Sequence, residues 1–237
     1  MDHLLYEKTI IFDGDSICQA GSEGPAPNRG WAYRIGDRNH MNWHNFGIGG
    51  GTLTAELYSL VTGNPRHWIS RSIDTIHEQF PCLDYLILEG GTNDADLLSG
   101  TPEKFGVIDP DDYSGSYDDQ TFCGACESLF FKALSYYPTA KIGFLIAPKM
   151  AACDPDTYKN RRYYFTKIME ICKKWGIPYL DLWDGCPLNP RLKVYYDETL
   201  STEENAQAGK AYVDGQHLSK IGYDIVSTKI EAWIRTL

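Results

Sequence analysis

Short apolar segments alternate along the chain with longer segments whose apolar residues recur every three or four positions. Compact apolar runs are typical of strands that are buried on both faces of a sheet. They predict strands at residues 8–13, 42–46, 84–89, 141–147 and 177–183. The helical period between them predicts helices near residues 29–38, 66–80, 121–137, 156–175 and 219–236.

The last of these helices has an apolar stripe at three- to four-residue spacing. The stripe consists of Ile221, Ile225, Thr228 and Ala232, with Val226, Ile230 and Trp233 beside it. We expect the helix to pack on the core through this side.

The alternation of strands and helices favours one parallel sheet that is covered by helices on both faces. Right-handed crossovers leave few topologies for five strands, and the flavodoxin-like order 2-1-3-4-5 fits best. We therefore expect an α/β fold, a three-layer α/β/α sandwich that forms a single domain over residues 1–237. In such a sheet, ligands bind beyond the carboxyl ends of the strands, where the strand order reverses. Functional residues should therefore follow the first three strands.

The charge of the chain limits its partners. The 237 residues include 32 acidic and 22 basic side chains, a net charge of −10, and no basic cluster is longer than residues 160–162. Such a chain repels phosphate backbones, so nucleic acid is not an expected partner. No apolar run is long enough to cross a bilayer, and the opening MDHLLYEKTII lacks the apolar stretch of a signal peptide. We expect a cytoplasmic protein with no membrane partner.

Two segments resemble parts of metal sites. Cys123 and Cys126 form a C-x-x-C pair, but no second pair completes four zinc ligands, and the seven scattered cysteines suit a reducing compartment. The acidic residues at 109–119 do not fit the EF-hand pattern, because Tyr113 and Ser114 occupy the positions of an oxygen ligand and of the turn glycine. We therefore expect idle thiols, a solvated acidic loop, and no metal or cofactor.

Polar and glycine-rich motifs follow each of the first three expected strands. These motifs are GDS at 14–16, NFGIGGGT at 45–52 and GGTND at 90–94. A fourth motif, DGQH at 214–217, precedes the last expected helix, which can return its start to the same edge of the sheet. The four motifs therefore meet the expectation for a site at the carboxyl edge.

These motifs contain the parts of a serine hydrolase. Ser16 follows an expected strand in a tight turn, where the N-terminus of a helix favours developing negative charge. The Ser16 hydroxyl needs a base to become a nucleophile. Of the six histidines, His217 alone has a carboxylate, Asp214, three residues earlier in a glycine-containing turn, and this spacing lets the acid orient the ring. The backbone N–H groups of Gly50 and Ser16 and the side-chain amide of Asn93 are candidate oxyanion donors.

Through these motifs the chain resembles the SGNH (GDSL) hydrolase family over nearly its whole length, from IIFDGDSI to VDGQHLSKIGYD. The resemblance implies the nucleophile Ser16, the oxyanion-hole residues Gly50 and Asn93, and the base His217 with its orienting acid Asp214. Within the glycine run, Gly49 is the alternative to Gly50. The family implies a three-layer α/β fold and ester hydrolysis through an acyl-serine, without a metal.

Two other functions stay open from the residues alone. The segment DGDS at 13–16 resembles the D-x-D motif of haloacid-dehalogenase-type phosphatases, in which Asp13 would attack phosphorus and Asp181 and Asp184 would have to hold magnesium. Ile17 breaks that motif, and the phosphatase reading leaves the asparagine and histidine motifs without a role. A non-catalytic carbohydrate-binding protein is the other alternative, suggested by 16 Tyr and 6 Trp residues. A pure binder, however, has no need of a nucleophile, a base and oxyanion donors together.

The sequence is least informative about the substrate. Within the resemblance, acyl thioesterases and lysophospholipases are alternatives to esterases. The long connections at 99–120 and 184–216 are polar, unlike lipase lids, so we expect a small acyl pocket that prefers acetyl to octanoyl. Tyrosines in these connections suit a hydroxyl-rich partner, namely Tyr113, Tyr117, Tyr195, Tyr196 and Tyr212. We therefore expect a small-molecule or oligosaccharide acyl ester, such as an acetylated sugar, as the substrate.

Overall fold

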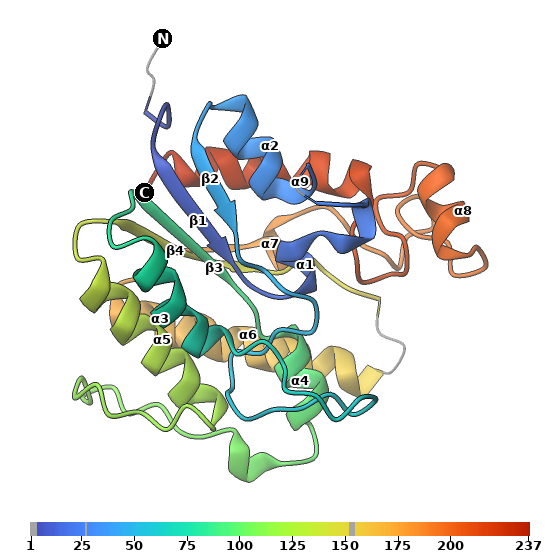
Figure 1. The fold of residues 1–237 in the computed structure, drawn as a ribbon. Helices are drawn as coiled ribbons and strands as arrows, with labels where there is room; N and C mark the ends of the chain where they lie inside the picture. Colours follow the sequence, from blue (N-terminus) through green and yellow to red (C-terminus); the bar gives the residue numbers. More distant parts are fainter. Residues whose placement is uncertain (1–3, 27, 152–154) are drawn as a thin grey trace.

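The computed structural model describes residues 4–26, 28–151 and 155–237, which form three layers (Figure 1). The middle layer is a parallel sheet of five strands: β1 (Thr9–Asp13), β2 (Asn42–Asn45), β3 (Tyr85–Glu89), β4 (Lys141–Ile146) and β5 (Tyr179–Asp181). Their order is β2-β1-β3-β4-β5, which confirms the expected topology. Ile11 of β1 is paired with His44 of β2 and with Leu86 of β3, so the end of β1 lies between the ends of its neighbours.

Helices cover both faces of the sheet. On one face, α2 (Gly30–Arg38) packs against α9 (Lys220–Ile234), and on the other, α3 (Ile69–Gln79) and α6 (Pro155–Trp175) flank α5 (Phe122–Tyr136) (Figure 1). These longer helices lie where the periodicity predicts them. The short helices are α1 (Ser16–Gln19), α4 (Thr92–Leu98), α7 (Leu182–Gly185) and α8 (Thr202–Gln207), with 3-10 turns at Gly21–Glu23 and Pro102–Lys104. In the described ranges, none of the helices has both the length and the apolar character needed to cross a bilayer.

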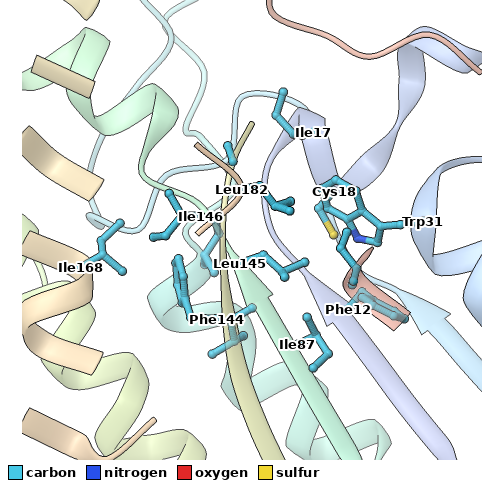
Figure 2. Packing of buried hydrophobic residues seen from close by; sticks show 14 of the residues in the cluster. Phe12, Ile17, Cys18, Trp31, Ile87, Phe144, Leu145, Ile146, Ile168 and Leu182 are labelled. Carbon is cyan, nitrogen blue, oxygen red and sulfur yellow. The ribbon is translucent and has the colours of Figure 1, made fainter. Parts of the chain in front are cut away.

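The apolar core lies on both sides of the central strands. All five residues of β3 are buried, as are the last four residues of β1. Figure 2 shows Ile168 of α6 to one side of the strands and Trp31 of α2, next to Cys18, to the other. The core therefore fixes the positions at which the central strands end, and with them the turns that follow.

The two edge strands differ from the expectation that every strand is buried on both faces. Asn42 of β2 is exposed and the rest of β2 is half-buried, as is the whole of β5. Each of these strands has a neighbour on only one side. Strand β5 is also shorter than the expected 177–183, because the Asp181 side chain accepts the Trp183 backbone N–H at 2.9 Å and caps α7.

The apolar stripe expected on α9 lies on the exposed side of the helix, whereas Val226 and Ile230 beside it are buried. Ile221 and Ile225 are 42% and 37% exposed, and Thr228 and Ala232 are exposed as well. The helix packs on the core through the neighbouring face, which consists of Gly222, Tyr223, Val226, Ser227, Ile230 and Ile234. Apolar residues occur on both faces at the same period, so the period alone does not identify the buried face.

Candidate active site

The turn after β1 presents Ser16 at the carboxyl edge of the sheet. The chain leaves β1 at Asp13 and begins α1 at Ser16, with Asp15 as the capping residue. The Asp15 Oδ1 accepts the Ile17 backbone N–H at 2.8 Å. The first N–H groups of a helix have no partner within it, and in the described ranges the Ser16 N–H has no acceptor. It is therefore available to a ligand.

His217 and Asp214 extend a chain of hydrogen bonds that begins at Ser16. His217 Nε2 lies 2.9 Å from Ser16 Oγ, and His217 Nδ1 lies 2.7 Å from Asp214 Oδ2. Asp214 Oδ1 accepts the backbone N–H groups of Gln216 at 3.0 Å and of His217 at 2.7 Å. Both carboxylate oxygens are thus held in place. The fold brings together two motifs that the sequence separates by 201 positions.

The charges around His217 suit a base. Burial lowers the pKa of His217, but the hydrogen bond and charge of Asp214, together with the charge of Asp15, outweigh burial and raise the pKa above its ordinary value. Burial raises the pKa of Asp214, but the hydrogen bonds from His217 outweigh burial and lower the pKa below its ordinary value. An ionised Asp214 therefore stabilises the ring when the ring takes up a proton.

The glycine run after β2 lies against the Ser16 turn. A Cβ atom built on Gly49 would lie 4.0 Å from the Ser16 Cβ. Gly50 adopts a φ of +77°, a left-handed conformation that favours glycine. Within the described part of the chain, the backbone N–H groups of Gly49 and Gly50 have no acceptor. Both glycines therefore remain candidates for the oxyanion donor.

Asn93 approaches the same turn from the start of α4. Its Nδ2 donates to the Gly51 carbonyl at 2.8 Å and, over a longer 3.3 Å contact, to Asp15 Oδ2. An oxyanion can replace the longer contact, since an amide nitrogen carries two hydrogens. The turn that precedes α4 requires glycine: Gly91 has a φ of +101°, and a Cβ atom there would lie 2.8 Å from Ile168 Cδ1.

Asp94 joins the segment after the glycine run to α4, a role that the sequence did not predict. The side chain is buried, and its oxygens accept the backbone N–H groups of Leu53 at 3.0 Å and Thr54 at 2.8 Å. Burial raises the pKa of Asp94 to about 6. The carboxylate therefore holds the glycine run and the helix that carries Asn93 in a fixed relation.

Arg161 is a second residue whose role the sequence did not predict. It is buried in α6 and donates to both carboxylate oxygens of Asp96, at 3.1 and 2.8 Å. It also donates to Gln216 Oε1 at 3.1 Å, and so ties the segment that carries His217 to α4 and α6. Nothing in the sequence marks this bridge, because its partners lie far apart along the chain.

Asp13 is not available as a phosphatase nucleophile. Its side chain is fully buried, with Oδ1 3.2 Å from His67 Nε2 and Oδ2 accepting the Ser72 hydroxyl. The acids proposed to hold magnesium are also engaged, since Asp181 caps α7 and Asp184 pairs with Arg162. Asp13 instead links the end of β1 to the segment that leads into α3. The phosphatase alternative is therefore wrong for this site.

Glu89 ends β3 and contacts the Ser16 turn from within the fold. Its Oε2 accepts the Asp15 backbone N–H at 3.2 Å, and the residue is 1% exposed. Burial raises the pKa of Glu89 well above its ordinary value, and the charge of Asp15 raises it further. Burial disfavours the charged form of a carboxyl group. The raised pKa of Glu89 therefore favours its neutral form beside the residue that caps α1.

The two segments that resemble parts of metal sites have other contacts. In the described residues, no group of three or more His, Cys, Asp or Glu side chains is arranged to hold a metal ion. Cys123 and Cys126 are buried in α5, where burial raises the pKa of Cys123 to about 12 and that of Cys126 well above its ordinary value. In the acidic loop, Asp119 pairs with Arg71 at 2.7 Å. Cys153 lies outside the described residues.

Known proteins resemble the chain in sequence pattern and in fold. A family model for GDSL-like lipases and acylhydrolases matches residues 12–225. No curated protein matches the chain. A crystal structure from Lactobacillus plantarum has 19% identity and a TM-score of 0.70, and the match covers 98% of each chain.

Two further structures have names that describe an activity. The aryl esterase of M. smegmatis has 16% identity and a TM-score of 0.62, and the match covers 97% of this chain and 99% of that one. A carbohydrate acetylesterase family member from Sinorhizobium meliloti has 15% identity and a TM-score of 0.58, and the match covers 97% of this chain and 98% of that one. At such identities, these likenesses show a shared fold.

Proposed function

The chain belongs to the GDSL-like lipase/acylhydrolase family, and from this premise we propose that it is a metal-independent serine esterase for short-chain acyl esters. Ser16 is the nucleophile, His217 the base and Asp214 the orienting acid. One observation carries the proposal: hydrogen bonds of 2.9 and 2.7 Å link Ser16 Oγ through the His217 ring to Asp214 Oδ2.

The first half of the reaction forms an acyl-serine. His217 Nε2 takes the proton of the Ser16 hydroxyl as Oγ attacks the ester carbonyl, and Asp214 stabilises the imidazolium. The N–H groups of Ser16 and Gly50 and the amide of Asn93 bind the negative oxygen. One such donor contributes roughly 3–4 kcal/mol to lowering the barrier. The bond to the alcohol oxygen then breaks, and His217 returns its proton to the leaving alcohol.

The second half of the reaction repeats these roles with water. His217 removes a proton from a water molecule, whose oxygen attacks the acyl carbon. The bond to Ser16 Oγ breaks, and the serine regains its proton from His217. The products are a carboxylic acid and an alcohol, and the enzyme is unchanged.

A polar cavity supports a hydroxyl-rich alcohol as the leaving group. The cavity has a volume of about 340 Å³, and Lys193, Tyr196 and Thr199 contribute to its lining. It borders the segment that carries His217, since a Cβ atom on Gly215 would lie 3.0 Å from the Tyr196 ring. The alcohol has to lie near His217 to be protonated, and this cavity borders the segment that carries His217. We therefore favour a carbohydrate ester, acetyl esters among them.

Most of the tyrosines that favoured a sugar at the sequence level do not support it. Tyr212 is buried and donates to the Lys149 carbonyl at 2.6 Å. The rings of Tyr113 and Tyr117 contact the Lys174 ammonium group, at 5.0 and 5.6 Å. The cavity beside Gly215, and not the number of tyrosines, therefore favours a sugar.

A chain-length series of esters tests the proposed function. p-Nitrophenyl acetate, butyrate and octanoate would be compared with an acetylated xylo-oligosaccharide and acetyl-CoA, using enzyme treated with EDTA. We expect full activity after EDTA, a preference for acetate over octanoate of about tenfold or more in kcat/KM, and no turnover by Ser16→Ala. A preference for octanoate would contradict the short acyl pocket. Faster turnover of acetyl-CoA than of any ester would identify a thioesterase, and no turnover of any substrate would favour a binding protein.

A further inference from the structure

Arg66 lies beside the glycine run that follows β2. It belongs to the segment between β2 and α3, which lies next to α4 in Figure 1. The backbone of this segment is fixed at two points, where Arg66 N donates to the Leu57 carbonyl at 3.0 Å and Thr52 N donates to the His67 carbonyl at 2.8 Å. A Cβ atom built on Gly50 would lie 2.2 Å from Arg66 Nη1. The guanidinium group therefore occupies the space that a side chain at residue 50 would fill.

The Arg66 guanidinium group has no partner in the described part of the chain. Its Nε is buried without a hydrogen-bond acceptor, and no carboxylate forms an ion pair with it. By contrast, Arg34, Arg71 and Arg161 lie within 2.7, 2.7 and 2.8 Å of a carboxylate oxygen. A partly buried guanidinium group is costly unless an anion satisfies its donors. In a chain with a net charge of −10, an arginine left unpaired beside a candidate oxyanion donor indicates an anionic ligand.

The position of Arg66 relative to His217 indicates which part of an ester it faces. The leaving alcohol has to lie within reach of His217, because the ring protonates it. His217 precedes α9, which covers one face of the sheet, whereas Arg66 precedes α3, which covers the opposite face. With the alcohol on the His217 side, we place the acyl group on the side of Gly50 and Arg66.

We propose that Arg66 binds a carboxylate on the acyl group, so that the preferred substrates are half-esters of short dicarboxylic acids such as succinate. This inference rests on the proposed esterase function and narrows its substrate class. A guanidinium group forms two parallel hydrogen bonds to a carboxylate, which fixes both the position and the orientation of the acyl chain. Hydrolysis breaks the bond between the acyl carbon and the alcohol oxygen. Water supplies the hydroxyl of the new carboxylic acid and the proton of the alcohol.

Acetyl esters do not use Arg66, because an acetyl group has no charge with which the guanidinium could pair. A succinyl group is longer than an acetyl group by one methylene and one carboxylate. With its oxyanion on the Gly50 N–H, the succinyl group directs this carboxylate to the neighbouring guanidinium. The inference therefore predicts a dependence on acyl charge at constant chain length, in addition to the preference for short chains.

Three esters that differ in the position of one charge test the proposal. Monoethyl succinate has a carboxylate on the acyl group, ethyl butyrate has the same number of acyl carbons and no charge, and carboxymethyl butyrate has its carboxylate on the alcohol. Acid release would be followed by titration at constant pH. For the wild type we expect kcat/KM for monoethyl succinate to exceed that for ethyl butyrate by about tenfold or more, the range of a charge-assisted hydrogen bond.

Variants of Arg66 and of a distant arginine show whether Arg66 causes the preference for monoethyl succinate. Arg66→Gln should abolish the preference for monoethyl succinate while changing ethyl butyrate turnover little, and Arg66→Lys should keep part of the preference. Arg38→Gln is the matched control, because Arg38 pairs with Glu231 at the far end of α2. Free succinate should inhibit the wild type more strongly than it inhibits Arg66→Gln. Thermal unfolding of each variant would exclude loss of folding as the cause.

The outcomes separate this inference from the proposed function. Hydrolysis of all three esters without a preference for monoethyl succinate, or with a preference for carboxymethyl butyrate, would overturn the role of Arg66 and leave the esterase intact. An equal loss on all three esters in Arg66→Gln would show that Arg66 stabilises the oxyanion and would also overturn the proposal. If the wild type hydrolysed none of the esters, the esterase function itself would be contradicted.

Discussion

At the scale of single residues, the charge of Asp214 determines the pH at which His217 can accept a proton. His217 has to be neutral to act as a base, and its pKa is raised above the ordinary value of 6.5. We therefore expect kcat/KM for p-nitrophenyl acetate to rise with pH through a midpoint above 6.5. Asp214→Asn removes the negative charge beside His217 but leaves the ring equally buried, so the midpoint should move to lower pH. The plateau of kcat/KM at high pH should fall about a hundredfold or more. An unchanged midpoint in the pH–rate profile would contradict the pairing.

Asn93 offers a test of the oxyanion site. Its amide hydrogen can bond to the developing oxyanion more strongly than to the ground-state carbonyl. Asn93→Ala should therefore lower kcat about a hundredfold and leave KM nearly unchanged. The variant also loses the 2.8 Å hydrogen bond from Asn93 to the Gly51 carbonyl, so thermal unfolding would measure any loss of stability. A change confined to KM would make Asn93 a substrate-binding residue.

Glu89 offers a test of the buried carboxyl beside the Ser16 turn. Its raised pKa means that the folded protein keeps the proton to a higher pH than the unfolded chain, which loses the proton above about pH 4.5. The contribution of Glu89 to stability is complete below that pH and declines as the pH rises. Glu89→Gln does not titrate, so its free energy of unfolding relative to the wild type should increase from pH 5 to pH 8. Urea unfolding at both values measures this difference, and a constant or decreasing difference would show that Glu89 is ionised.

At the scale of secondary structure elements, the strands and long helices could be predicted because each has a clear hydrophobic period. The order of the strands could be predicted because crossover connections between parallel strands have one hand. The buried face of α9 could not be predicted, because Ile221 and Ile225 match the period on the exposed face. The end of β5 depends on the cap that Asp181 provides, which an apolar pattern does not reveal.

The segment 99–120 shows a tertiary contact that fixes a loop to two helices. The side chain of Lys174 in α6 is 6% exposed, and its ammonium group lies 2.8 Å from Glu127 of α5. The rings of Tyr113, Tyr117 and Trp175 lie around this ammonium group. Removing one member of a buried ion pair leaves the other charge unpaired. Lys174→Met should therefore lower the free energy of unfolding by about 3 kcal/mol or more without changing the turnover of short esters.

Urea unfolding of Lys174→Met and of the double variant Lys174→Met/Glu127→Met checks this prediction. The double variant should be more stable than the single one, since it leaves no buried charge alone. Equal loss in both variants would mean that the unpaired charge of Glu127 is not what destabilises Lys174→Met.

At the scale of the whole molecule, the candidate site forms where three neighbouring strands end and where the last helix begins. This meeting place could be predicted from sequence, because the carboxyl ends of parallel strands share one edge and the four motifs follow or approach that edge. The roles of Asp94, Arg161 and Arg66 could not. Each depends on a contact with a residue that no local pattern connects to it.

The central claim is that Ser16 is a nucleophile activated by His217, and covalent labelling tests it most directly. The wild type, Ser16→Ala and His217→Ala would be incubated with a fluorophosphonate, and the intact mass and the modified peptide of each would be determined. We predict one adduct per chain of the wild type, located on Ser16, none on Ser16→Ala, and slow labelling of His217→Ala. A wild-type protein that stays unlabelled, or an adduct that persists in Ser16→Ala, would contradict the account.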